Sequence, residues 1–279
     1  MEYRLHQNGW TVLVDDFDLT KATQDNINTI ARWLATNTLV FFKNQQLDVD
    51  EELRLIEMFK DAEAWAEYGT DAYENECVPN TRGLIARVTG EKNKNGETGL
   101  AGHKEEMVWH ANRPWQKDRR SLIWLYGVKG TSGSVTTWTN NILAYEKLPV
   151  EEQEFLKTLK IVPRGGLEHD TKDVKDIYTT DAYHNVVQTN IAGKVGLFFP
   201  WLQIDSFVGM TREESLPILE KYGKYITKPE FCYDHYWEDG DLSIAEQWLG
   251  IHKRHYFNEI KSRLLHRAAF DFPDQDYTL

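Results

Sequence analysis

The sequence is poor in cysteine, in long apolar runs and in positive charge, and each shortage excludes a class of protein. Its 279 residues contain two cysteines, Cys77 and Cys232, too far apart to suggest a disulfide framework or a zinc site, so we expect a reducing, cytoplasmic setting. No stretch reaches the roughly 18 apolar residues of a membrane-spanning helix, and no apolar run follows the N-terminus as in a signal peptide. The net charge of -12 argues against nonspecific binding to nucleic acids or to anionic membranes.

The composition is otherwise that of a folded protein. Hydrophobic residues make up 41% of the chain, enough for a sizeable core, and 13% of the residues are aromatic. The length suits one domain spanning 1–279, and no internal repeat is visible. We expect a small-molecule substrate as the partner, and a homo-oligomer stays open.

The first 60 residues predict helices that lean on a sheet. Residues 10–14 and 38–42 form short apolar runs typical of strands, and the second ends at a polar pair. Asp18 or Thr20 is expected to cap the helix between them, and Asp48 the helix that follows.

The rest of the chain alternates short strands with glycine-rich turns. Residues 121–128 and 135–138 read as a hairpin joined by a turn at 129–133. Helices are expected at 145–159 and 213–222, and strands at 241–245 and 262–270. This pattern predicts an α+β, mainly β fold, a double-stranded β-helix (jelly roll) with flanking helices. The weakly patterned segment 61–108 is expected to form a lid.

One stretch, from Val108 to Trp115, carries the strongest chemical signal. In a strand, residues two apart point to the same face, so His110 and Asn112 would aim an imidazole and an amide at one point. Two histidines and one carboxylate are the usual ligands of non-haem iron(II), and here an Asn stands at the carboxylate position. A single histidine on a strand is more often structural, so this pair alone does not establish a metal site.

The last predicted strand carries two arginines on an otherwise apolar face. Read as a strand, it places Arg263, Leu265 and Arg267 on one side. An unpaired buried charge is expensive, so both arginines need anionic partners. The alternative is that they sit in water at the strand ends or pair with some of the 44 acidic residues.

Taken in order, the motifs resemble the taurine dioxygenase-like family of Fe(II)/2-oxoglutarate oxygenases. Trp109-His110-x-Asn112 is similar to that family's W-H-x-D, and the turn around Thr136 is similar to its G-G-D-T-x-W. An acidic turn at 239–242 precedes His252, and Arg263 follows at a matching distance. The resemblance spans nearly the whole chain.

The resemblance implies a role for each of these residues. His110 and His252 would bind iron(II), with Asn112 at the third ligand position. Arg263 would hold the far carboxylate of 2-oxoglutarate in a bidentate pair, and Thr136 would donate its hydroxyl to it. Arg267 would serve the other end of the cosubstrate or an anionic group of the substrate.

The sequence leaves other assignments open. Glu106 stands where the resemblance suggests a substrate contact, suited to a cationic amine, although a solvated charge is an equal reading. His103-x-Glu105 is an alternative ligand pair. His255 and His266 are rivals of His252 as the distal ligand, whereas His169, His184 and His235 are expected to be structural.

Two departures from the family pattern matter. Ala245-Glu246-Gln247 replaces its Trp-Asp-Asn, and Asn112 replaces the carboxylate ligand. An amide oxygen is a poorer donor than a carboxylate, so iron should be held more loosely. Asn112 would ligate through its oxygen in a hydroxylase, swing aside for chloride as in the radical halogenases, where Gly or Ala occupies the position, or mark a lost iron site.

The resemblance therefore implies an enzyme that uses Fe(II), 2-oxoglutarate and O2. We expect it to hydroxylate an unactivated C–H bond of a small polar substrate, such as an amino acid or other amine. A radical halogenase of the same superfamily is the first alternative, and a non-catalytic jelly-roll protein that binds small molecules is the second.

Overall fold

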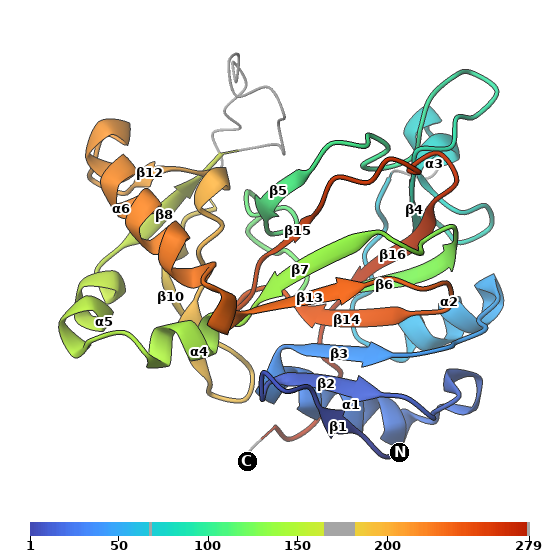
Figure 1. Ribbon diagram of the computed structural model, residues 1–279, viewed down its shortest axis with the longest axis horizontal. Coiled ribbons are helices and arrows are strands. Elements are labelled where there is room, and N and C mark those ends of the chain that lie inside the picture. Colours follow the sequence, from blue (N-terminus) through green and yellow to red (C-terminus); the bar gives the residue numbers. More distant parts are fainter. Residues whose placement is uncertain (67–68, 165–181, 278–279) are drawn as a thin grey trace.

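Two facing β-sheets form the centre of the molecule (Figure 1). The computed structural model describes residues 1–66, 69–164 and 182–277. The larger sheet has seven strands in the order β1 (Arg4–Leu5), β2 (Thr11–Val14), β3 (Leu39–Phe42), β14 (Leu242–Glu246), β6 (Leu122–Lys129), β16 (Leu264–Phe270) and β4 (Ala86–Thr89). The smaller sheet has four, in the order β13 (Cys232–Tyr236), β7 (Val135–Thr139), β15 (His252–Arg254) and β5 (Met107–His110).

Side-chain alternation along the central strands builds two cores, one on each face of the larger sheet. In β6, Leu122, Trp124 and Tyr126 belong to the cluster under the helices, as their period of two predicts. Ile123 lies on the opposite face and joins Trp138 of the smaller sheet in the core between the sheets. These two facing sheets with flanking helices are the jelly roll that the sequence predicts.

Two helices cover the outer face of the larger sheet (Figure 1). α1 (Gln24–Asn37) begins after Thr23, which accepts a hydrogen bond from the backbone of Asn26, so the expected cap at Asp18 or Thr20 is wrong. Asp18 instead caps a separate 3-10 turn, η1 (Leu19–Lys21). α2 (Val49–Glu57) begins after Asp48, as expected.

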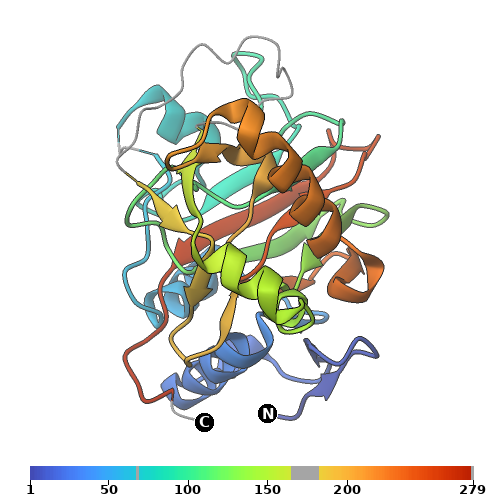
Figure 2. The same ribbon diagram turned by 90° about the vertical axis from the view of Figure 1, so that its left-hand side faces the viewer.

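The remaining helices gather mostly at one end of the molecule (Figures 1 and 2). The predicted helix 145–159 is two helices, because Pro149 lacks a backbone N–H and interrupts the helical hydrogen bonding. The predicted helix 213–222 is confirmed and extends further in both directions. The elements of this end are α4 (Asn141–Glu146), α5 (Val150–Lys157), β8 (Lys160–Pro163), β9 (His184–Asn185), β10 (Val187–Thr189), β11 (Val195–Leu197), η2 (Trp201–Gln203), β12 (Ile204–Phe207), α6 (Arg212–Ile226) and η3 (Pro229–Phe231).

The predicted hairpin between residues 121–128 and 135–138 is wrong, although both strands exist. β6 pairs with β14 and β16 in the larger sheet, whereas β7 pairs with β13 and β15 in the smaller one. The glycine turn between them therefore crosses from one sheet to the other. Asp239 holds this crossing, since its carboxylate accepts hydrogen bonds from the backbone of Gly130 and Thr131.

Segment 61–108 is partly regular. It holds α3 (Asp71–Glu76) and β4, which pairs with β16 at the edge of the larger sheet. Its role as a lid stays a prediction. Within the described ranges, no helix is long and apolar enough to cross a membrane.

Candidate active site

His110 and His252 face each other on neighbouring strands of the smaller sheet. They are direct partners in the antiparallel register of β5 and β15, and their ring centroids are 4.2 Å apart. Both side chains are buried. The two imidazoles are 142 residues apart in the chain (252 − 110), and sheet pairing brings them into contact.

The surroundings of the two rings suit metal binding. The Nδ1 of His110 lies 2.7 Å from the carbonyl oxygen of Val108, which can only accept, so Nδ1 carries a hydrogen and Nε2 is the ring nitrogen that could bind a metal ion. Burial, with smaller effects of His110 and Arg267, holds the pKa of His252 well below its usual value. Neutral imidazole is the form that binds metal ions.

Asn112 lines the same cavity as the two histidines. Its neighbour Ala111 points the other way and donates its backbone N–H to the side chain of Gln203, at 2.8 Å. The Nδ2 atom of Asn112 is buried and makes no hydrogen bond within the described part of the chain. The described residues contain no group of three or more His, Cys, Asp or Glu side chains that could hold a metal ion. Asn112 and the two histidines thus bring two imidazoles and an amide to one cavity.

Arg263 lies in this cavity of about 190 Å³ as a buried cation. Its Nε donates to the Ser134 hydroxyl at 3.3 Å, and its Nη1 is buried with no hydrogen-bond partner among the residues described. Burial and the nearby charge of Arg254 lower the pKa of Arg263 to about 9, which leaves it charged at neutral pH. A buried charge with an unused donor calls for an anion.

Thr136 lies in the same cavity with its hydroxyl oriented by a tryptophan. The Nε1–H of Trp237 donates to the Thr136 hydroxyl oxygen at 2.9 Å. Because that oxygen accepts from Trp237, the hydroxyl hydrogen is directed to another acceptor. Thr136 is thus placed to donate to an anion held by Arg263.

Arg267 is the second cation that the last strand contributes. Its guanidinium lies 4.3 Å from the centre of the Trp65 ring, and the guanidinium of Arg113 lies at the same distance from that ring. Arg113 forms an ion pair with Glu63 at 2.6 Å, whereas Arg267 has no ion pair within the described structure. Burial, above all, lowers the pKa of Arg267 to about 9.

The cavity as a whole is positively charged with apolar walls. Three of its lining residues are the arginines 254, 263 and 267, and no described residue that lines it carries a carboxylate. The Nη1 and Nη2 atoms of Arg254 already donate hydrogen bonds to the backbone carbonyls of residues 101, 103 and 105. The unused guanidinium donors fit a dicarboxylate, and the facing imidazoles fit a metal ion beside it. The residues present therefore fit Fe(II) and 2-oxoglutarate.

Two acidic candidates lie away from this cavity. Glu106 is exposed, with its carboxylate 3.4 Å from the ammonium of Lys253, and its neighbour Met107 lines the cavity instead. Its contact with substrate stays a prediction. Glu105 is also exposed, and neither it nor His103 lines the cavity, so the alternative pair gains no support from the geometry.

The two rivals of His252 also face elsewhere. His255 lies on the opposite side of β15 from His252 and contacts the Thr137 hydroxyl at 2.7 Å. His266 lies on the helix side of the larger sheet and contacts the carboxylate of Glu52 at 2.6 Å. Of the three, His252 alone lines the cavity in the described structure.

The histidines expected to be structural have partners inside the protein. His184 donates to the backbone carbonyl of Pro114 at 2.9 Å, and burial lowers its pKa to about 4. His235 contacts the Asp241 carboxylate at 2.8 Å. His169 lies outside the described residues.

Trp65 and Arg254 are among the cavity residues that sequence reasoning missed. Trp65 comes from segment 61–108, which shows no period that would predict its direction. Arg254 stands two residues after His252, so strand alternation alone could have placed it on the same face.

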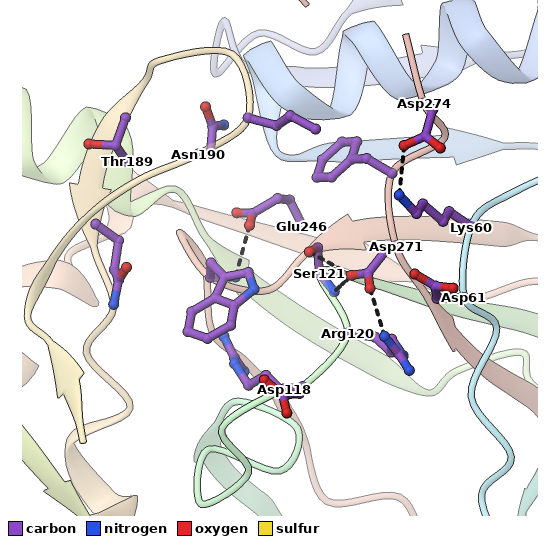
Figure 3. A pocket seen from close by; sticks show the side chains of 15 residues that line it. Lys60, Asp61, Asp118, Arg120, Ser121, Thr189, Asn190, Glu246, Asp271 and Asp274 are labelled. Atoms are coloured by element: carbon purple, nitrogen blue, oxygen red, sulfur yellow. Dashed lines mark hydrogen bonds and ion pairs between the residues drawn. The ribbon is translucent and has the colours of Figure 1, made fainter. Parts of the chain in front are cut away.

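A second, larger cavity of about 550 Å³ lies beside the turn that follows β14 (Figure 3). Asp271 joins Arg120 and Ser121 on its wall, and Lys60 pairs with Asp274. Glu246 is buried there and accepts hydrogen bonds from two backbone N–H groups, those of residues 248 and 249. Burial raises the pKa of Glu246 to about 7.

The raised pKa of Glu246 predicts a pH dependence of stability. A carboxyl whose pKa is higher in the folded state binds more protons there, so its contribution to stability is present below pH 4.5 and is lost as the pH rises through 7. The free energy of unfolding of the wild type, relative to Glu246→Gln, is expected to fall between about pH 5 and 7.5. Urea unfolding of both proteins across this range measures it, and a pH-independent difference would contradict it.

Comparison with known proteins identifies the family. The profile of the family described as "Taurine catabolism dioxygenase TauD, TfdA family" matches residues 5–269. The chain belongs to the TauD/TfdA family. This family comprises Fe(II)- and 2-oxoglutarate-dependent dioxygenases, which use O2, so the resemblance drawn from the motifs is confirmed.

Relatives of this TauD/TfdA protein are distant in sequence and similar in fold. Pentalenolactone F synthase of Streptomyces arenae is 21% identical over 192 residues, which cover 62% of this chain and 64% of that enzyme. A taurine dioxygenase from Burkholderia xenovorans has a TM-score of 0.75 at 22% identity, covering 95% of this chain and 86% of its own. AAD-2, solved with Mn(II) and N-oxalylglycine, has a TM-score of 0.80 at 18% identity, covering 98% of each chain.

Proposed function

We propose that this protein is an Fe(II)/2-oxoglutarate-dependent oxygenase that hydroxylates an unactivated C–H bond of a small polar substrate. One observation carries the proposal: the facing imidazoles of His110 and His252 share a cavity with the buried, partly unpaired guanidinium of Arg263. A pair of metal ligands beside an unused cation is the arrangement that a chelating dicarboxylate needs.

Each residue has a defined task. His110 and His252 would hold the iron, and Asn112 would add its amide oxygen. Arg263 would bind the far carboxylate of 2-oxoglutarate through two parallel hydrogen bonds, and Thr136 would donate to it. When bound, iron and 2-oxoglutarate together supply the activation of O2. The protein's task is to hold the substrate carbon close by and to exclude water.

The substrate is proposed to carry an anionic group. Arg267 has no acidic partner in the described structure, and Trp65 stacks on its guanidinium and fixes its orientation. The carboxylate of an amino acid would fit this arginine, which agrees with an amino acid substrate better than with a simple amine. N-oxalylglycine, seen in AAD-2, is a chemical analogue of 2-oxoglutarate, and the similar fold supports that cosubstrate here.

Anaerobic titration with Fe(II) and 2-oxoglutarate tests the proposal. A weak visible charge-transfer band is expected on binding of both, and a protein that lacks the iron site would show none. A screen of amino acids and amines for succinate release then identifies the substrate class.

Two other functions stay as alternatives because of Asn112. With a carboxylate ligand, iron(II) and dianionic 2-oxoglutarate, the centre carries one net negative charge, and with Asn112 it is neutral. A chloride ion in place of the amide would restore that charge, as in a halogenase. Asn112 is larger than Gly or Ala and can occupy the ligand's space, which ranks hydroxylation first. The third function is binding of small molecules without catalysis.

Asn112→Asp is expected to tighten iron binding and to keep or raise oxygenase turnover, because a carboxylate is a stronger ligand than an amide. The measurement is the Fe(II) dissociation constant, together with mass spectrometry of products made in chloride and in chloride-free buffer.

The same variant separates the three functions. A chlorinated product that the wild type makes and the variant loses would support the halogenase. Iron binding and turnover that only the variant shows would support a binding protein with a disabled site. The wild type in chloride buffer is the control.

A further inference from the structure

Arg119 is a buried arginine that lines the second cavity and contacts the backbone of Asn112. Its guanidinium lies between two aromatic rings, 4.2 Å from the centre of Phe198 and 4.1 Å from that of Trp248. It donates from Nη1 to the backbone carbonyl of Asn112 at 3.1 Å and from Nη2 to that of Gln247. Its Nε is buried and has no hydrogen-bond partner in the part of the chain described.

Burying the guanidinium charge of Arg119 costs free energy, which indicates that the charge serves a function. Within the described residues, Arg119 forms no ion pair, and Glu246 is the acid that most favours its charged form. Burial lowers the pKa of Arg119 to about 9, so the side chain stays charged at neutral pH. Removing a cation from water costs several kcal/mol, so a neutral side chain would suit a merely structural position better.

The two carbonyls belong to the two segments that carry the histidines. Asn112 lies two residues after His110, and Gln247 lies in the turn between β14 and β15, which leads to His252. Arg119 therefore links these two segments through its two hydrogen bonds.

The carbonyl of Asn112 also belongs to a strained peptide. The next residue, Arg113, has φ of 49°, in the left-handed region that side chains other than glycine rarely adopt. Such a conformation costs about 1–3 kcal/mol and persists when surrounding contacts hold it. Arg119 donates its hydrogen bond to the carbonyl of this peptide. By holding that carbonyl, it fixes the backbone of Asn112 and with it the direction of the Asn112 side chain.

We propose that Arg119 is a positioning residue that holds the Asn112 amide at the metal site. The inference rests on the proposed function, since it needs a metal bound by His110 and His252. Without the guanidinium, the strained turn relaxes and the amide leaves the metal, whereas the two histidines stay in place because sheet hydrogen bonds hold them.

Binding of Co(II) in the presence of 2-oxoglutarate, followed by its visible absorption, tests the proposal without turnover. Arg119→Lys is expected to weaken Co(II) binding about tenfold, because one ammonium cannot span both carbonyls. The matched control is Arg120→Lys at the adjacent position, where the side chain pairs with Asp271; it should bind Co(II) within about twofold of the wild type.

A double-mutant cycle decides whether Arg119 acts through Asn112. In an Asn112→Ala background, Arg119→Lys should cause no further loss of Co(II) affinity. An equal tenfold loss in that background would overturn the inference, because Arg119 would then act on the histidines or on the fold.

Two further results complete the test. If Arg119→Lys fails to fold, as judged by its thermal unfolding, Trp248→Leu replaces it, because it loosens the guanidinium while keeping its charge. It should weaken Co(II) binding in the same direction, and unchanged affinity would overturn the inference. If the wild type binds neither Co(II) nor 2-oxoglutarate, the proposed function fails and the inference fails with it, whereas wild-type binding with unaffected variants overturns the inference alone.

Discussion

Replacing either His110 or His252 by alanine is expected to abolish Fe(II)-dependent turnover of 2-oxoglutarate. The described residues provide no third histidine, cysteine or acid that could take over as a ligand. With an amide at the third position, a protein that has lost one imidazole is expected to bind iron too weakly to be loaded at the Fe(II) concentrations used in the assay. Succinate release with the identified substrate, or uncoupled turnover without it, measures the effect.

His255→Ala is the matched control for the distal ligand. His255 is three residues from His252 but faces the Thr137 hydroxyl, so its loss should leave turnover within about threefold of the wild type. Full activity of His252→Ala combined with loss of activity in His255→Ala would show that the assignment of the distal ligand is wrong.

The second large effect is expected at the cosubstrate. Arg263→Ala should raise the 2-oxoglutarate concentration needed for half-maximal turnover by at least about a hundredfold. Removing one partner of a buried ion pair costs about 3–5 kcal/mol, and each 1.4 kcal/mol is a factor of ten. Steady-state kinetics with varied 2-oxoglutarate measures this requirement.

Two companion variants make the Arg263 result specific. Arg267→Ala should change the requirement for 2-oxoglutarate far less, because Arg267 is proposed to face the substrate. Arg263→Lys should not rescue binding, because a single ammonium cannot form the two parallel hydrogen bonds of a guanidinium. Wild-type affinity in Arg263→Ala would mean that 2-oxoglutarate is held elsewhere.

The sequence predicts most of the strands but not their partners. The period of two along β6 correctly separates Trp124 from Ile123, because burial on one face depends on local alternation alone. The hairpin with β7 fails because β14 and β16, more than a hundred residues later, occupy both edges of β6. Pairing of that kind depends on contacts distant in the chain, which a local pattern does not contain.

The sequence predicts those cavity residues that belong to the ordered motifs or to strands with alternating side chains. His110, Asn112, Thr136, His252, Arg263 and Arg267 all line one cavity, as the resemblance implied. Glu106 was placed by analogy of position; its neighbour Met107 lines the cavity, and the contact of Glu106 with substrate stays a prediction. Trp65 was missed because the sequence around it shows no period that would predict the direction of its side chain.

The register that sets His110 opposite His252 also decides what the metal contributes to folding. Backbone hydrogen bonds between β5 and β15, together with those of β7, already hold the two strands that carry the imidazoles, so little backbone conformational entropy remains to be lost on binding. Metal binding would then stabilise the protein only by mass action, rising with the logarithm of metal concentration, and chelation would leave the sheets intact. A zinc finger, whose chain collapses when its metal is withdrawn, lies at the other extreme of this coupling.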